Sequence, residues 1–206
     1  MFRAEKISKS FGTVHALKEF DISIKAGEIR GLVGENGSGK STLTSCLTGI
    51  YKKDSGTFTL EGKEITATNQ VEANHQGVAI IVQEIGTLSG LTVAENIFLG
   101  NEDRFTKYGV KNTAAMNRQA QEYLNSYGFS YIDASRTIDD YNFEDRKLIE
   151  IVKSTYFNPK VLVVDETTTA LGQKGREELF KVMHRMRDNG SCVIFISHDL
   201  EEVIEQ

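Results

Sequence analysis

The sequence has little proline and no long apolar run. Pro159 is the single proline in 206 residues, and no low-complexity linker or internal repeat divides the chain. No apolar stretch reaches the roughly 18–20 residues that a membrane-spanning helix needs, and the N-terminus lacks the apolar segment of a signal peptide. The length suits one large domain with a full core. We therefore expect a globular domain whose contact with a membrane comes through a partner.

Cysteine is scarce, and positive charge is not in excess. Cys46 and Cys192 lie far apart, without the spacing of a metal or redox site. We expect both to be reduced residues of the core in a cytosolic protein. The formal net charge is −5, whereas binding to a nucleic-acid backbone needs a basic face. Nucleic acid is therefore not an expected partner.

The apolar pattern alternates between strand and helix signals along the chain. Strands are predicted, in chain order, at residues 3–7, 20–25, 28–33, 57–60, 78–82, 161–164 and 192–196. Helices are predicted at residues 40–49, 114–127, 144–155 and 175–187, with a last helix beginning at Asp199. The all-apolar runs at 161–164 and 192–196 are typical of parallel strands buried on both faces. The pattern predicts an α/β core with a helical insertion over about residues 93–157.

A glycine-rich segment follows the strand predicted at 28–33 and fits the phosphate-binding pattern G-x-x-x-x-G-K-[ST]. Its residues are Gly34, Glu35, Asn36, Gly37, Ser38, Gly39, Lys40 and Ser41, followed by Thr42. Glycines permit a sharp turn in which successive N–H groups face phosphate oxygens, and the start of the next helix adds partial positive charge. We expect Lys40 to contact the β- and γ-phosphates, Ser41 to bind Mg²⁺ and Thr42 to lie near the α-phosphate. The alternative is a chance glycine-rich turn, which the flanking strand and helix disfavour.

Two later strands end in residues that suit hydrolysis of a bound nucleotide. Asp165 ends the apolar run at 161–164, and an aspartate there can hold Mg²⁺ directly or through water. Glu166 is then placed to polarise the attacking water as a general base. His198 follows the strand at 192–196, where it can bond the γ-phosphate; a surface or core role is its alternative. These residues predict ATP hydrolysis.

Three stretches together make the chain resemble the ABC ATPases, and among them the tandem ATPase subunits of simple-sugar importers. The stretches are Val-Gly-Glu-Asn-Gly-Ser-Gly-Lys-Ser-Thr at 33–42, Val-Ala-Glu-Asn-Ile-Phe-Leu-Gly at 93–100 and Ile-Ser-His-Asp-Leu-Glu-Glu-Val at 196–203. The resemblance covers essentially the whole chain. It implies an α/β fold: a P-loop NTPase core with a RecA-like parallel sheet, an antiparallel β subdomain and an α-helical insertion at about 85–157. It also implies that 1–206 is a single nucleotide-binding domain, which we expect to be truncated at its C-terminus.

The resemblance carries two further roles onto this sequence. Gln83 matches the glutamine that contacts Mg²⁺ or water and couples the site to the membrane partner; an ordinary polar residue after a strand is its alternative. Phe11 matches the aromatic residue that stacks on adenine, with a packing role as its alternative. The cofactors implied are ATP and Mg²⁺.

The sequence departs from the family pattern at two places. The family's Leu-Ser-Gly-Gly-Gln signature aligns with Tyr141, Asn142, Phe143, Glu144 and Asp145, none of which matches. Glu144 and Asp145 bring two carboxylates toward a polyanion, and at about 4 Å each repulsion is roughly 1 kcal/mol in water and roughly 4 at an intermediate dielectric. They nevertheless suit the N-terminus of a helix. Gly172 stands where the family has the aspartate of its D-loop, and both segments serve the nucleotide of the opposite domain.

The leading hypothesis is therefore an ATPase domain that powers import of a simple sugar, with one competent and one degenerate composite site. The implied partners are a second ABC ATPase domain, membrane permease subunits and, indirectly, a sugar-binding protein, at the cytoplasmic face of the membrane. One alternative is a regulatory or non-transport ABC-type module with little turnover. Another is a different P-loop NTPase such as a kinase, which leaves the ordered set of Gln83, Asp165, Glu166 and His198 without explanation.

Overall fold

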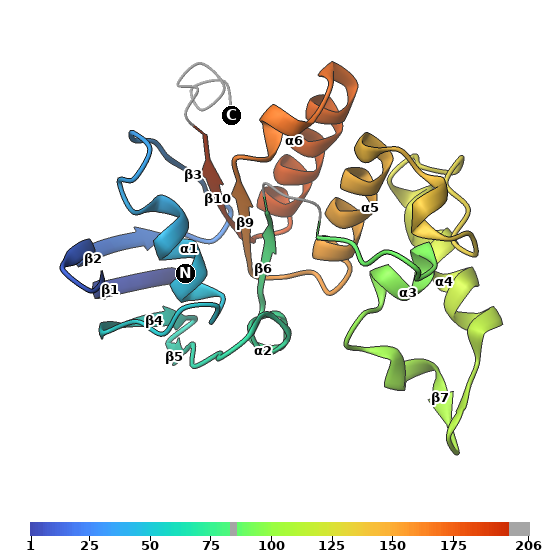
Figure 1. Ribbon diagram of the computed structural model, residues 1–206, viewed down its shortest axis with the longest axis horizontal. Helices are drawn as coiled ribbons and strands as arrows, with labels where there is room; N and C mark the ends of the chain where they lie inside the picture. The colour runs from blue at the N-terminus through green and yellow to red at the C-terminus, as the bar shows by residue number, and fades with distance from the viewer. Residues whose placement is uncertain (83–85, 198–206) are drawn as a thin grey trace.

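The structure is a computed structural model, and it describes residues 1–82 and 86–197 (Figure 1). Two expected site residues, Gln83 and His198, lie outside these ranges, as does the helix expected from Asp199.

Strands and helices alternate along the described ranges as the sequence pattern predicts. The strands there are β1 Phe2–Phe11, β2 Val14–Ile24, β3 Ile29–Leu32, β4 Ser55–Leu60, β5 Lys63–Glu64, β6 Val78–Ile81, β7 Thr106–Lys107, β8 Val110–Lys111, β9 Val161–Asp165 and β10 Cys192–Ile196. The α-helices there are α1 Lys40–Leu47, α2 Gln70–His75, α3 Val93–Ile97, α4 Thr113–Ser126, α5 Phe143–Thr155 and α6 Gln173–Asp188. Short 3-10 turns lie at η1 Glu102–Phe105, η2 Ile138–Asp140 and η3 Thr167–Ala170.

A parallel sheet with the strand order β3-β10-β9-β6 occupies the centre of the molecule (Figure 1). Ile196, the last residue of β10, pairs with Leu32 on one side and with Asp165 on the other. Because the strands are parallel, their carboxyl ends meet at one edge, where open α/β sheets bind ligands. The sheet therefore brings the segment after β3 and the end of β9 to the same edge.

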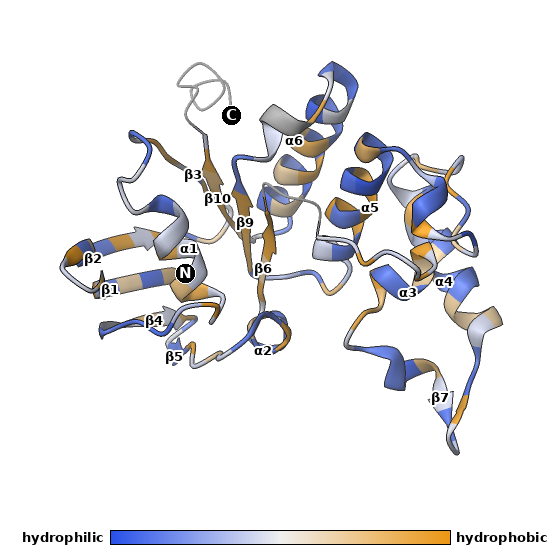
Figure 2. Ribbon diagram, in the orientation of Figure 1, coloured by the Kyte–Doolittle hydropathy of each residue, from blue (hydrophilic) through white to orange (hydrophobic). Residues whose placement is uncertain are grey.

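The two faces of the parallel sheet supply two separate cores, because alternate side chains of a strand point to opposite faces. Val161 and Val163 pack with α1 and the antiparallel strands, whereas Leu162 and Val164 pack with the helices that follow β6. All four side chains are fully buried. Figure 2 shows these strands as mostly hydrophobic ribbons. The expectation of parallel strands buried on both faces is confirmed.

A four-stranded antiparallel sheet, in the order β2-β1-β4-β5, lies beside α1 (Figure 1). Its first two strands are longer than the predicted segments at 3–7 and 20–25. The pairing of β1 with β2 shifts register between Ala4 and Ile7, and again on either side of Lys9. Each shift interrupts the apolar alternation that marks a strand in sequence, so the pattern reveals only part of each strand.

The segment between β6 and β9 contains α3, α4 and α5, in agreement with the expected helical insertion, and α4 buries Met116, Ala120 and Leu124 at a spacing of four residues. The expected helical insertion also contains β7 and β8, which form a small antiparallel hairpin that the sequence pattern did not predict. Tyr108 and Gly109 both have a positive φ at its turn, a conformation that interrupts a helix. Over the described ranges, no helix has the length and apolar character needed to cross a membrane.

Candidate functional site

Residues 34–41, which the sequence predicts to be a phosphate cradle, comprise the loop after β3 and the first two residues of α1, and most of them are exposed. Gly34, Gly37 and Gly39 all have a positive φ there, which non-glycine residues rarely adopt. Gly39 is also held by close packing, since a Cβ on it would lie well under 3.0 Å from the carbonyl oxygen of Ala16. The backbone of strand β2 therefore requires glycine at this position.

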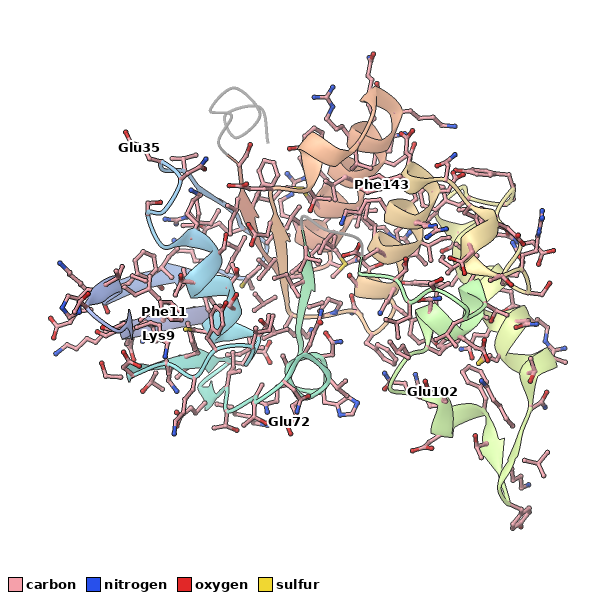
Figure 3. All side chains as sticks on the ribbon, viewed as in Figure 1. Lys9, Phe11, Glu35, Glu72, Glu102 and Phe143 are labelled. Atoms are coloured by element: carbon pink, nitrogen blue, oxygen red, sulfur yellow. The ribbon has the colours of Figure 1, made fainter. Side chains whose placement is uncertain are left out.

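The ammonium of Lys40 lies inside the cradle. Its Nζ donates to the carbonyl oxygens of Gly34 at 2.7 Å and Glu35 at 3.0 Å. A positive charge is thus held at the centre of a loop whose glycines leave the backbone accessible. Figure 3 shows Glu35 at the tip of this loop, with its side chain pointing away from the molecule.

The N-terminus of α1 opens into the same loop. Its N-cap is Gly39, and among the described residues no side chain caps it and no acidic residue occupies its first turn. The first N–H groups of a helix have no intrahelical partner, so they are free to bind an anion at the positive end of the helix dipole. Ser41 is exposed and Thr42 is half-buried beside this end.

Asp165 lies at the carboxyl end of β9, next to α1. Thr44 of α1 donates to its Oδ2 at 3.3 Å, while its Oδ1 is buried and finds no hydrogen-bond partner among the described residues. Burial raises the pKa of Asp165 above its ordinary value, against an opposing hydrogen bond from Thr44, and the Ser41 hydroxyl lies close enough to lower it as well. A buried carboxylate oxygen beside hydroxyl groups is a donor set that Mg²⁺ accepts, so these residues fit a magnesium ion.

Glu166 follows Asp165 in the left-handed region, with φ at 44°. Its backbone N–H donates to the carbonyl oxygen of Ile196 at 3.0 Å, which ties the end of β9 to the end of β10. A non-glycine residue held at positive φ is uncommon and marks functional or strained positions. Glu166 lies at the edge of the parallel sheet that also carries the cradle.

Gln83 and His198, the two expected site residues outside the described ranges, follow β6 and β10 in the sequence. Strand β6 ends at Ile81, two residues before Gln83, and β10 ends at Ile196, two residues before His198. Both strands end at the edge that carries Asp165; Gln83 and His198 themselves lie outside the described residues.

Phe11 ends β1 at the hairpin that precedes Ala16, the residue packed against the cradle. Its ring is 43% exposed, with Lys9 Nζ 5.3 Å from its centre and Tyr51 in edge contact at 5.2 Å. Figure 3 shows Phe11 beside Lys9 on the antiparallel sheet. An exposed aromatic face suits stacking on a base, and Tyr51 and Lys9 already occupy part of the space around the ring.

The start of α5 differs from a phosphate-binding helix start. Asn142 caps the helix by accepting from the Asp145 N–H at 2.9 Å, and Phe143 is exposed beside it (Figure 3). The Glu144 carboxylate turns toward α6: a Cβ on Gly172 would lie 3.3 Å from it, and one on Gly175 would lie 2.8 Å from it. The Glu144 carboxylate therefore lies close to the backbone at Gly172 and Gly175.

Sequence reasoning missed two features of this region. One is Thr44, whose hydroxyl bonds Asp165 and which the apolar pattern assigns to a helix without a further role. The other is Lys147 of α5, which is fully buried and paired with Glu150. A charged residue on an amphipathic helix normally indicates a solvated face, so no signal in the sequence identifies this pair.

Cradle, helix start and strand-end carboxylate define a P-loop nucleotide-binding domain with an α/β core. A family model described as ABC transporter matches residues 17–169. The chain belongs to the ABC transporter family.

Individual relatives agree with this assignment. The ribose import ATP-binding protein RbsA of Bacillus cereus is 41% identical over 199 residues, which cover 97% of this chain and 40% of that protein. The galactofuranose transporter ATP-binding protein YtfR of Escherichia coli is 37% identical over 205 residues, covering 100% of this chain and 40% of that protein. The chain thus spans about 40% of the length of these curated relatives.

Solved structures share the fold. A nucleotide-free ATP-binding cassette from an ABC transporter matches with a TM-score of 0.83 and 28% identity, covering 99% of this chain and 83% of that one. The cassette architecture of core, antiparallel sheet and helical segment is therefore that of this chain.

Proposed function

We propose that this chain is the ATP-binding and ATP-hydrolysing domain of an ABC importer for a simple sugar. The observation that carries the proposal is the convergence of the cradle at 34–41 and Asp165 on one edge of the parallel sheet. Similarity to RbsA and YtfR, whose names describe ribose import and galactofuranose transport, supports the sugar class.

In the proposed site the cradle and the start of α1 bind the phosphates, and Lys40 neutralises the β- and γ-phosphates. Ser41 and Asp165, with Gln83, would hold Mg²⁺, which supplies charge neutralisation at the transferred phosphoryl group. Glu166 accepts a proton from the attacking water, and His198 orients that water against the γ-phosphate. Phe11 stacks on adenine.

We further propose that two such domains face each other and that this one cannot complete its partner's site. At the start of α5, Glu144 and Asp145 bring negative charge where an opposed γ-phosphate would lie, and Asn142 already uses its carboxamide oxygen for the cap. The residues that serve this domain's own nucleotide carry no such change. The assembly would then have one hydrolysing site and one that holds nucleotide with little turnover.

The proposed assembly includes a second ABC ATPase domain and membrane permease subunits at the cytoplasmic face of the membrane, with a sugar-binding protein acting through the permease. The altered α5 start also favours a second candidate, a regulatory or non-transport ABC-type module with little turnover. Partner capture distinguishes the two: a permease supports transport, whereas a ribosomal or DNA partner supports the alternative.

The proposal is tested with the full-length protein, comparing Lys40→Ala with Lys63→Ala, a lysine of β5 away from the cradle. Calorimetric titration with Mg-ATP should show binding in the parent and in Lys63→Ala and a loss in Lys40→Ala. ATP hydrolysis in vesicles that contain the permease should rise with sugar and its binding protein. Equal ATP affinity in the two variants would sink the site assignment, and hydrolysis indifferent to every permease and sugar would sink the transport assignment.

A further inference from the structure

A buried ion pair on α5 has no role in the site described above. Lys147 Nζ lies 2.9 Å from Glu150 Oε2, and the two side chains are 0% and 4% exposed. Burial of charge is unfavourable unless the groups are paired and their remaining hydrogen bonds are satisfied. A pair at this depth therefore has to be explained by its other contacts.

Those contacts reach both sides of the short segment that follows β6. Glu150 Oε1 accepts from the Val82 N–H at 3.2 Å, and its Oε2 accepts from the Gly86 N–H at 3.1 Å. Lys147 Nζ donates to the carbonyl oxygen of Val82. The peptide groups on either side of residues 83–85 are thus bonded to one buried pair.

Two further residues on the same face of α5 also donate hydrogen bonds to the backbone of this region. Lys153 Nζ donates to the Gly86 carbonyl oxygen at 3.4 Å, and Ser154 donates to the Ile80 carbonyl oxygen at 3.2 Å. Residues spaced by three and four lie on one face of a helix. Strand β6 is an edge strand of the parallel sheet, so Ser154 satisfies a backbone carbonyl that a further strand would otherwise pair.

Gly86 completes the arrangement by its small size. A Cβ there would lie 3.0 Å from Glu150 Oε1 and 3.1 Å from its carboxyl carbon. The Glu150 carboxylate therefore packs directly on the backbone of Gly86 and also accepts a hydrogen bond from its N–H group.

We propose that Lys147 and Glu150 are positioning residues for ATP hydrolysis, because they fix the chain on both sides of Gln83. The inference rests on the proposed role of Gln83 and adds the residues that fix the backbone at Val82 and Gly86, on either side of it. Neither residue needs to touch nucleotide, so both act through the backbone at Val82 and Gly86.

Glu150→Gln in the full-length protein tests this directly. The glutamine amide keeps the volume of the carboxylate, but its NH₂ group is a donor. It therefore faces one of the two backbone N–H groups, of Val82 or Gly86, without accepting a hydrogen bond from it. The matched control is Val152→Ala. Val152 is a fully buried residue of the same helix that packs in the hydrophobic core, and none of the hydrogen bonds described above to Val82 or Gly86 involves it. Both variants should lower the unfolding midpoint, but only Glu150→Gln changes the hydrogen bonds to Val82 and Gly86.

The expected result is a fall in kcat of about tenfold in Glu150→Gln, with the KM and Kd for ATP within about twofold of the parent. The Mg²⁺ concentration for half-maximal rate should rise, and Val152→Ala should retain the parent kcat below its unfolding temperature. An equal kcat in the two variants would overturn the inference. If Glu150→Gln does not fold, Gly86→Ala takes its place, because its Cβ would lie 3.0 Å from Glu150 Oε1 and disturb the same contact while the ion pair stays complete.

Failure of this inference is distinguishable from failure of the proposed function. Gln83→Ala is measured beside the other variants. If Gln83→Ala slows hydrolysis and Glu150→Gln does not, only the positioning role is refuted. If Gln83→Ala leaves the rate unchanged, the proposed role of Gln83 itself is refuted.

Discussion

Replacement of Asp165 by asparagine should change stability in opposite directions with and without nucleotide. The aspartate combines a raised pKa, caused chiefly by burial, with an Oδ1 atom that is buried and lacks a partner within the described ranges. Asp165→Asn removes the charge and keeps the shape. Without ligand the variant should therefore be more stable than the parent, while the site loses the carboxylate proposed for Mg²⁺.

The size of the effect follows from the charge on the unpaired oxygen, which asparagine removes. A buried polar atom without a partner is unfavourable by about 1–3 kcal/mol, and more if charged. For a domain of this length, each kcal/mol shifts the unfolding midpoint by about 2–4 °C, so we expect a gain of about 2–12 °C without ligand. The parent should gain about 2.7 kcal/mol from nucleotide at 100 times its Kd, and the magnesium-dependent part of this gain should be absent in the variant.

Thermal unfolding monitored by fluorescence or circular dichroism, with and without Mg-ATP, measures both effects. Asp139→Asn is the matched control, because the Asp139 carboxylate accepts from Ser89 and from the Gly90 N–H at 2.8 Å. That satisfied carboxylate has a lowered pKa, owing first to the Gly90 N–H, so its loss should reduce stability slightly. A lower midpoint for Asp165→Asn without ligand, or an undiminished shift with Mg-ATP, would refute the reasoning.

The same substitution has a defined pH dependence. Because the folded pKa of Asp165 is raised above its ordinary value of 3.8, the stability it contributes is present at low pH and is lost as pH rises through the folded pKa. The advantage of Asp165→Asn over the parent should therefore grow as pH rises above 3.8 and should vanish in acid. An advantage that is constant with pH would show that the charge is not the cause.

Three other predictions concern the cradle, the stacking of Phe11 on adenine, and the contact between Glu144 and Gly172. Gly39→Ala should reduce stability by about 1–3 kcal/mol and abolish ATP binding, since a Cβ collides with the Ala16 carbonyl at a positive φ; unchanged binding by calorimetry would contradict this. Phe11→Leu should weaken ATP binding by about 0.5–1.5 kcal/mol while Phe11→Trp retains it, as a fluorescent-nucleotide titration can show, and equal weakening would contradict stacking. Gly172→Asp should destabilise more in the parent than beside Glu144→Gly, because its carboxylate meets that of Glu144; additive effects in a double-mutant cycle would contradict contact between them.

The core of the fold was predictable from sequence because parallel strands buried on both faces give continuous apolar runs. The expected strand at 192–196 coincides with β10, and the one at 161–164 differs from β9 by a single residue. The β7–β8 hairpin escaped prediction because two-residue strands carry no period. The extent of β1 escaped it because register shifts interrupt the alternation.

The candidate site divides in the same way. Local motifs predicted the cradle and Asp165, since the residues that shape a P-loop are adjacent in sequence. Contacts between distant segments could not be predicted, because no local pattern records them. Glu144 against Gly172, and Lys147 with Glu150 against Val82, depend on how α5 packs on the sheet edge.

The central claim is that this domain's own catalytic residues hydrolyse ATP, and Glu166→Gln in the complete assembly tests it most directly. ATP affinity should remain within about twofold of the parent, while the steady-state rate of hydrolysis should fall by about 100-fold or more, as expected on loss of a general base. ATP hydrolysis at the parent rate in the Glu166→Gln assembly would contradict the claim.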